Sequence, residues 1–119
     1  MGKFVIRETS TGFVFDLKAT NGETVAASEV YSTKASAIKG AESVAKCAAS
    51  AKLADLTEGM TATNPKFELF QDRAGEFRFR LKARNGEVIA TSEGYSTKVS
   101  CLNGIDSVRR NAPEAVIVD

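Results

Sequence analysis

Apolar and polar residues alternate along residues 13–19 and again along residues 77–83. This period of two is the pattern of a β-strand with one buried face. The inward positions are Phe13, Phe15, Leu17 and Ala19 in the first stretch and Phe77, Phe79, Leu81 and Ala83 in the second. The two stretches therefore predict two similar half-buried strands.

Each strand is followed by an Asn-Gly pair, Asn21-Gly22 or Asn85-Gly86. This dipeptide favours a two-residue type I′ turn, in which both central residues have positive φ. Such a turn predicts two hairpins and fixes the pairing of their strands. The predicted pairs are Thr20 with Glu23, Ala19 with Thr24, Lys18 with Val25, Leu17 with Ala26, Phe15 with Ser28, Arg84 with Glu87, Leu81 with Ala90 and Phe79 with Ser92.

A helix is predicted after each hairpin, because apolar residues recur at the spacing i, i+4, i+7 and i+11. These residues are Ala37, Ala41, Val44 and Ala48, and then Cys101, Ile105, Val108 and Ala112. Ser32 or Thr33, and Ser96 or Thr97, are suitable N-caps. Gly40 and Gly104 lie within the helices, where glycine costs about 1 kcal/mol relative to alanine, so we expect a close helix–sheet approach there.

Short apolar segments complete each unit. Lys3–Glu8 and Lys66–Gln71 precede the hairpins and are predicted to be strands, with Phe4, Ile6, Phe67 and Leu69 facing inward. Residues 52–54 and 116–118 follow the helices and are predicted to be short closing strands. Each unit is therefore β-β-β-α-β. The fold class is α+β, and we expect an antiparallel sheet with the helices packed on one face.

The two units are copies of one another at an offset of 64 residues, as from Asn21 to Asn85. From Phe13–Val44 to Phe77–Val108, 19 of 32 aligned positions are identical, which indicates a tandem duplication. We expect one compact domain over residues 1–119, with repeat 1 at 2–55, a linker at 56–65 and repeat 2 at 66–119. A unit this small is only marginally stable alone, so the repeats should pair as an internal pseudo-dimer with pseudo-twofold symmetry, in a monomeric chain.

Composition excludes little but favours a cytoplasmic protein. The net charge is +1, which provides no strong field toward nucleic acid or a membrane. Residues 1–4 contain no signal-peptide pattern, and no apolar run is long enough to span a membrane. Cys47 and Cys101 are far apart and are interpreted as small buried residues with free thiols. The sequence contains no histidine, no glycine-rich phosphate loop and no metal-ligand motif, so no cofactor is expected.

The duplicated motif resembles the YegP-like family of small bacterial proteins. The residues that carry the resemblance are Asn85-Gly86-Glu87, Ser92-Glu93, Tyr95–Lys98 and Gly104–Val108, with their counterparts in repeat 1. Repeat 1 departs from the pattern at Ala41 and Ala49, where repeat 2 has Ile105 and Pro113. The resemblance implies one sheet formed by both units, with the last strand of each crossing to the other. From the residues themselves this exchange is an open alternative. The family has no established activity, so no site residue follows from it.

The segments that begin the two helices are candidate anion sites. Helix N-termini have free N–H groups and a positive dipole end, and a lysine follows in each case. The candidate residues are Ser32, Thr33, Lys34, Ser96, Thr97 and Lys98. The alternative is that the hydroxyl groups only cap the helices while Tyr31 and Tyr95 pack against the sheet.

A second candidate site is the outward face of the second alternating strand. Arg78, Arg80, Lys82 and Arg84 are spaced by two, so they should point the same way and could contact nucleic-acid phosphates. Repeat 1 has Val14, Asp16, Lys18 and Thr20 there, so this feature is not duplicated. No exposed aromatic residues interleave with the cations, and a solvated sheet face is the simpler interpretation.

The functional prediction is a non-enzymatic binding or interaction module whose partner is unknown, with a protein as one candidate. Nucleic-acid binding through the basic strand of repeat 2 is the alternative, and an enzyme of unknown type is the third. An uncovered sheet edge or a large apolar patch would favour a protein partner.

Overall fold

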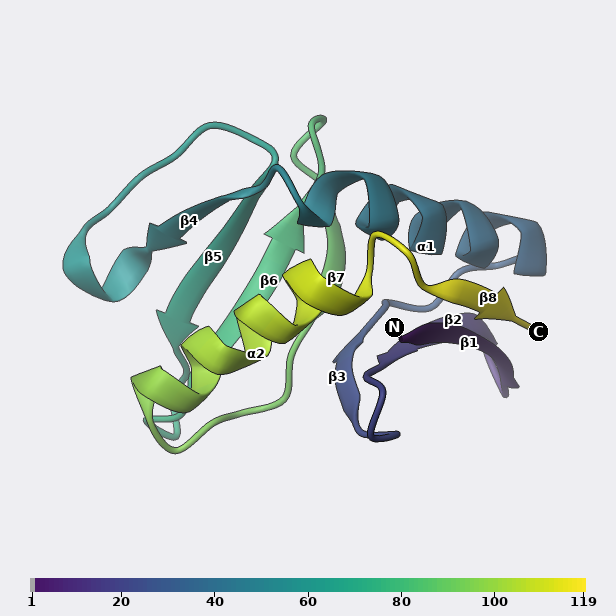
Figure 1. Ribbon diagram of the computed structural model, residues 1–119, viewed down its shortest axis with the longest axis horizontal. Coiled ribbons are helices and arrows are strands. Elements are labelled where there is room, and N and C mark those ends of the chain that lie inside the picture. The colour runs from purple at the N-terminus through teal and green to yellow at the C-terminus, as the bar shows by residue number, and fades with distance from the viewer. Residues whose placement is uncertain (1) are drawn as a thin grey trace.

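The computed structural model describes residues 2–119, which form one mixed eight-stranded sheet and two long helices (Figure 1). Repeat 1 contributes β1 (Lys3–Thr9), β2 (Gly12–Lys18), β3 (Thr24–Ala27), α1 (Lys34–Ala48) and β4 (Lys52–Asp55). A short 3₁₀ helix, η1 (Leu56–Glu58), begins the connection between the repeats. Repeat 2 contributes β5 (Lys66–Gln71), β6 (Phe77–Lys82), β7 (Val88–Thr91), α2 (Lys98–Asn111) and β8 (Val116–Val118). The predicted β-β-β-α-β unit is confirmed in both repeats.

The repeats exchange their last strands. The strand order is β4-β5-β6-β7-β3-β2-β1-β8, with β4 parallel to β5 and β8 parallel to β1. The expectation of an antiparallel sheet is therefore wrong at both edges, because each exchanged strand runs parallel to its new neighbour. At the centre β3 and β7 run antiparallel and pair through Ala27 and Thr91, which are equivalent positions of the two repeats. The approximate twofold axis therefore passes through this pair. Strand exchange, which the sequence left open, follows from the order of the strands.

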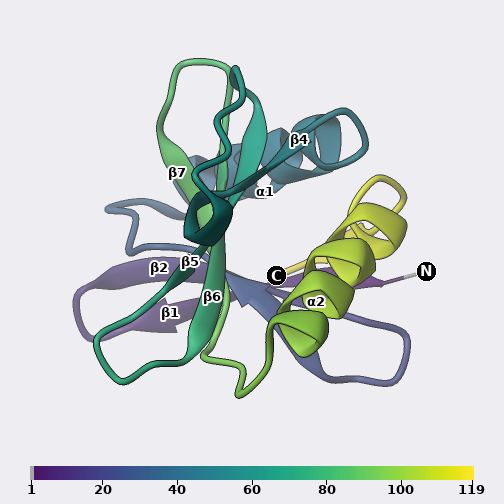
Figure 2. The ribbon, with the colours of Figure 1, turned by 90° about the vertical axis from the view of Figure 1, so that its left-hand side faces the viewer.

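Both helices cover the same face of the twisted sheet (Figure 2). Their predicted apolar stripes are buried in a core shared with the inward phenylalanines Phe4, Phe15, Phe67 and Phe79. Because one core contains side chains from both repeats, neither repeat encloses its own apolar surface. Within residues 2–119, no helix has the length and apolar character needed to cross a membrane.

The hairpin turns differ from the prediction. Gly22 and Gly86 have φ of 86° and 87°, whereas no other described residue type has positive φ, so the type I′ turn is wrong. The N–H of Gly22 donates to the Ala19 carbonyl, and the N–H of Ala19 donates to the Glu23 carbonyl, both at 2.9 Å. This is a three-residue loop that ends in a left-handed glycine and a bulge. The Asn21 side chain favours it by accepting the Glu23 N–H at 3.0 Å.

The bulge shifts the pairing only beside the turn. Lys18 pairs with Thr24 rather than with Val25, and Ala19 bonds Glu23 rather than Thr24. Farther away, Leu17 pairs with Ala26 as predicted. Repeat 2 shows the same correction, because Lys82 pairs with Val88 and Ala83, not Arg84, bonds Glu87. The inward faces of both strands are therefore those that the sequence pattern gives.

The helices begin where the sequence indicates. Thr33 and Thr97 are the N-caps, and each hydroxyl accepts the N–H three residues later at 3.1 Å. The mid-helix glycines allow a close approach, though to a tyrosine ring rather than to the sheet backbone. A Cβ built on Gly104 would lie 2.9 Å from Cζ of Tyr95, and one built on Gly40 would lie 2.8 Å from Cζ of Tyr31. These tyrosines therefore pack between sheet and helix.

Candidate functional site

The two helix N-termini, predicted as equivalent anion sites, have different surroundings. Lys98 forms ion pairs with Asp55 at 3.0 Å and with Glu58 at 3.1 Å. Burial opposes ionisation of Asp55, but hydrogen bonds from Thr57 and Lys98 hold the pKa of this carboxyl below its usual value. Lys34 is exposed and forms no such pair within residues 2–119. At the N-terminus of α2, therefore, two carboxylates already pair with Lys98, the lysine that a bound anion would need.

The hydroxyl groups at these N-termini act as caps. Thr33 also donates to the Ser36 hydroxyl at 2.9 Å, and Thr97 to Ser100 at 3.0 Å, while Ser32 and Ser96 are exposed. Anion binding at either terminus stays a prediction.

The cations of the basic strand are not all on one face. Arg78, Arg80 and Lys82 alternate with the buried Phe79 and Leu81, so all three point outward from β6. Arg84 lies beyond the end of β6, in the turn, and lines a shallow cavity together with Lys46 and Cys47 of α1. The prediction that four cations share one face is therefore wrong for Arg84, because the strand ends at Lys82.

A buried carboxylate neutralises part of this strand. Glu68 of β5 is 6% exposed and lies 2.7 Å from Arg80 and 3.3 Å from both Lys66 and Lys82. Burial alone would raise the pKa of Glu68, but hydrogen bonds from these three cations lower it. Sequence reasoning missed Glu68, although the register of β5 and β6 places it directly opposite Arg80.

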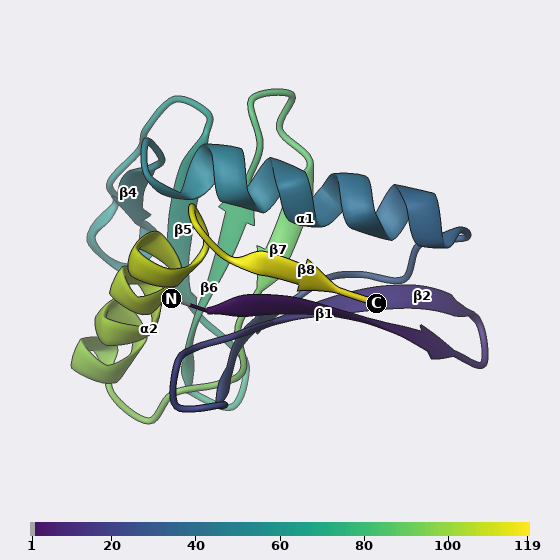
Figure 3. The same ribbon diagram turned by 45° about the vertical axis from the view of Figure 1, so that its right-hand side comes forward.

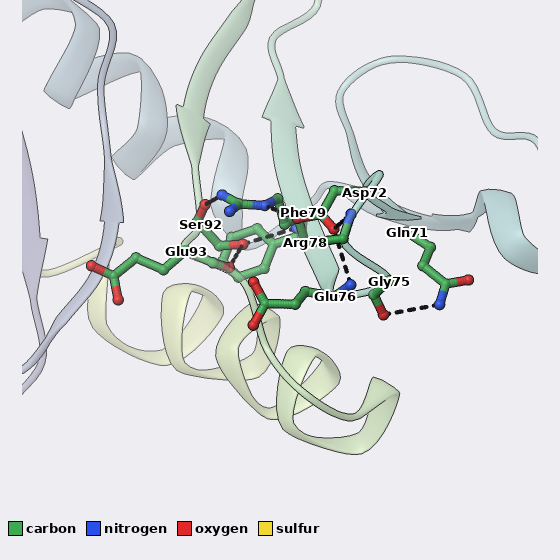
Figure 4. Close-up of polar contacts among 9 residues, drawn as sticks. Gln71, Asp72, Gly75, Glu76, Arg78, Phe79, Ser92 and Glu93 are labelled. Carbon is green, nitrogen blue, oxygen red and sulfur yellow. Dashed lines mark hydrogen bonds and ion pairs between the residues drawn. The ribbon is translucent and has the colours of Figure 1, made fainter.

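Arg78 is held at two points in Figure 4. Its Nε donates to Asp72 at 2.6 Å, and one terminal nitrogen donates to the Ser92 carbonyl at 3.4 Å. Asp72 accepts the backbone N–H groups of Ala74 at 2.9 Å and Glu76 at 3.0 Å. The pairing with Asp72 raises the pKa of Arg78 and, reciprocally, lowers that of Asp72. The turn over residues 72–76 thus holds the Asp72 carboxylate in place, and this carboxylate orients the Arg78 side chain.

Beside Arg78 the outer face of the sheet is hollowed into a cavity of about 390 Å³. Arg78, Ser92 and Glu93 line it from repeat 2, and Arg7 and Asp16 line it from repeat 1, with residues 24–27 and Thr91 between them. Arg7 donates through Nε to Asp16 at 2.7 Å, and this pairing raises the pKa of Arg7. Of these residues the sequence singled out only Arg78, because contacts across the sheet centre leave no local pattern. We call this feature the outer-face cavity.

These features define a class of protein: a small α+β pseudo-dimer of two repeats that share one sheet, with its cavity at the junction. The chain belongs to the family described as a domain of unknown function, DUF1508, which matches it twice, over residues 9–55 and 72–119.

Relatives cover either one repeat or both. UPF0339 protein YegP of Yersinia pestis is 36% identical over 120 residues, covering 100% of this chain and 96% of that protein. A UPF0339 protein of Treponema denticola is 59% identical over 54 residues, covering 45% of this chain and 93% of its own length. The latter therefore corresponds to a single repeat. The YegP-like resemblance seen in the duplicated motif is confirmed over the full chain.

Solved structures agree with the fold. The solution structure of yegP from E. coli, titled a protein of unknown function, has a TM-score of 0.80 and 35% identity, covering 99% of this chain and 91% of that one. A UPF0339 protein from Shewanella oneidensis gives a TM-score of 0.80 at 32% identity, covering 99% of this chain and 90% of that one.

Proposed function

We propose that this protein is a non-enzymatic interaction module that binds an extended segment of a partner protein along the outer edge of β8. The observation that carries the proposal is the exposure of this edge strand. Val116, Ile117 and Val118 are 56%, 36% and 43% exposed. Edge strands present unpaired N–H and C=O groups, and apolar ones without charges are the type that accept another strand.

The opposite edge of the sheet provides an internal comparison. β4 is the counterpart of β8, yet its Ala54 is fully buried and its Asp55 is 7% exposed. The connection between the repeats runs beside β4, where the Lys52 ammonium group donates to the Thr63 hydroxyl at 3.1 Å and the Met60 N–H donates to the Asp55 carbonyl. In Figure 1 this connection arches outside β4, whereas β8 ends the sheet, with β1 on one side and α1 above the other. The duplication therefore leaves one edge covered and the other open.

The surroundings of β8 suit a segment with alternating apolar side chains. β8 lies between β1 and α1 in Figure 3, and a cavity of about 340 Å³ is lined there by Phe4, Ala41, Ala45 and Ile117, among others. An added strand would place every second side chain on this helix-covered side of the sheet. Main-chain hydrogen bonds would then supply affinity, and the cavity would supply selectivity.

Peptides selected from a random display library against the intact chain test the proposal. We expect apolar residues at alternate positions, amide NMR shifts at residues 115–118 and none at 52–55. Val118→Lys should abolish binding, whereas Val99→Lys, at a valine that is 67% exposed on α2, should not. Peptides that bind equally well to Val118→Lys would refute it.

Nucleic-acid binding has weaker support from the outer face. Arg78, Arg80 and Lys82 do share that face, but Asp72 and Glu68 pair with them and reduce the charge that a phosphate backbone would meet. If RNA or DNA does bind there, the double substitution of Arg78 and Arg80 by glutamate should abolish a salt-sensitive gel shift.

A further inference from the structure

The outer-face cavity lies across the approximate twofold axis and is independent of the β8 edge. Ala27 and Thr91, the pair on the axis, both line it. Both have short side chains, so the outer face of the sheet is depressed at its centre. Arg7 and Asp16 rise on the repeat 1 side, and Arg78 and Glu93 on the repeat 2 side. At about 390 Å³ it has the size of a small-molecule site.

Hydrogen bonds orient the two arginine side chains but leave some of their N–H groups unpaired. Arg7 and Arg78 each donate through Nε to a carboxylate, which fixes the side chain and leaves terminal N–H groups available. Their side chains are 56% and 38% exposed. Arg78 makes one further contact, a long 3.4 Å bond to the Ser92 carbonyl. Guanidinium groups fixed in this way are suited to receive a carboxylate.

Glu93 provides a free charge of the opposite sign. Within residues 2–119 its carboxylate accepts no hydrogen bond and forms no ion pair, and in Figure 4 it extends away from Arg78. The lining therefore contains two guanidinium groups, one carboxylate committed to Arg7, and one uncommitted carboxylate. A simple anion would be repelled by Glu93, and a simple cation would be repelled by both arginines. A ligand with one charge of each sign can place each charge beside a lining group of opposite sign.

The positions related to the two arginines by the approximate twofold axis have different chemistry. The positions that correspond to Arg7 and Arg78 are Phe70 and Val14. Val14 is 6% exposed, and Phe70 lies under Arg80, whose guanidinium carbon is 4.6 Å from the ring centroid. Val14 pairs with Arg7 across β1 and β2, and Phe70 pairs with Arg78 across β5 and β6. Neither arginine therefore has an arginine at its symmetry-related position, and duplication alone would not have produced this charged lining.

We propose that the outer-face cavity binds a small zwitterion of the α-amino-acid type. Its carboxylate would accept from the terminal nitrogens of Arg7 and Arg78, and its ammonium group would donate to Glu93. Thr24 and Thr91 also line the cavity and add hydroxyl groups.

The common amino acids, added one at a time to the intact chain, test this by amide NMR shifts at residues 24–27 and 91–93. We expect saturable shifts for at least one amino acid, lost with its N-acetyl derivative and with its amide. Glu93→Gln and Arg7→Gln should each weaken binding at least tenfold, the effect of losing about 1.4 kcal/mol.

Matched controls come from the same chain. Glu29→Gln alters the repeat 1 counterpart of Glu93, and Arg73→Gln removes an exposed arginine near Arg78; neither residue lines the cavity. Both controls should bind like the unaltered chain. The absence of shifts with every amino acid would overturn the proposal. So would phosphate binding that Glu93→Gln leaves unchanged, because it would indicate a simple anion site.

Discussion

Replacing Gly104 with alanine sets two opposing effects of known size against each other. Alanine favours the helical backbone over glycine by about 1 kcal/mol. The new methyl group, however, would lie 2.9 Å from Cζ of Tyr95 and 3.1 Å from Cε2 of Phe79. Favourable carbon–carbon contacts lie near 3.5–4.0 Å. Either the helix or the tyrosine must therefore move.

Neither neighbour can move freely. Ile105 and Val108, on the same helix face, are 3% and 0% exposed. The backbone of Tyr95 is held by two hydrogen bonds to Phe77, each 2.8 Å long. Overpacking of this kind costs about 1–3 kcal/mol, so after the helical gain we expect net destabilisation of about 1 kcal/mol.

Urea unfolding of the single variants and of a double-mutant cycle measures this effect. Asn103→Ala, at the exposed neighbouring position, should stabilise the protein by about 0.5 kcal/mol. In a Tyr95→Ala background, Gly104→Ala should become stabilising, because the nearer of the two rings that the methyl group meets is gone. Gly40→Ala should behave as Gly104→Ala does, since Tyr31 occupies the equivalent place. Stabilisation of about 1 kcal/mol by Gly104→Ala in the otherwise unaltered chain would refute the packing argument.

Three further outcomes are expected. Glu68→Gln should cost about 1–3 kcal/mol in urea at pH 7, because three cations lose their shared carboxylate. The folded pKa of Glu68 is lowered, so its contribution to stability is complete above the unfolded pKa of about 4.3 and is lost as pH falls through the folded pKa. The free energies of unfolding of the variant and of the unaltered chain should therefore converge in acid, and a difference that stays constant with pH would contradict this. Cys101 is fully buried, and this burial, with a smaller contribution from Asp55, raises its pKa to about 11. Alkylation at pH 8, followed by mass spectrometry, should therefore modify Cys101 only in urea, and rapid labelling in the native protein would disprove this. Chains cut within residues 59–63 should give halves that fold only together, because β8 pairs with β1 and β4 pairs with β5; two separately stable monomers in sedimentation experiments would exclude this dependence.

The fold was largely readable from the sequence because its signals are local. Alternation at Phe13–Leu17 identifies a strand and its buried face, and the spacing of Ala37, Ala41 and Val44 identifies a helix and its buried stripe. Thr33 is an N-cap because the unpaired N–H groups lie within one turn of it. Repetition of each signal at an offset of 64 residues, as from Thr33 to Thr97, gave every one an independent test.

The hairpin loops show where local signals become ambiguous. Asn-Gly is compatible both with a two-residue turn and with the last two residues of a three-residue loop. The three-residue loop shifts the pairing of the residues beside Gly22 by one, and a bulge absorbs this shift, so Leu17 still pairs with Ala26. The buried pairs were therefore predictable, and the turn that joins them was not.

The candidate sites were less predictable because they depend on residues distant in the sequence. The alternation of Arg78, Arg80 and Lys82 was visible, but their neutralisation by Asp72 and Glu68 requires the register of a neighbouring strand and turn. The outer-face cavity brings Arg7 together with Arg78 across the whole sheet centre. No spacing within either repeat encodes that proximity.

The sequence by itself thus determined the repeat, the order of its elements and the faces that they bury, since these depend on neighbours within a few residues. Only the tertiary structure decided that the last strands exchange, that the connection after Asp55 covers one sheet edge while β8 stays open, and that unlike side chains meet about the twofold axis. The physical reason is that identical local patterns produce equivalent units, whereas the surroundings of each unit are set by contacts with the other.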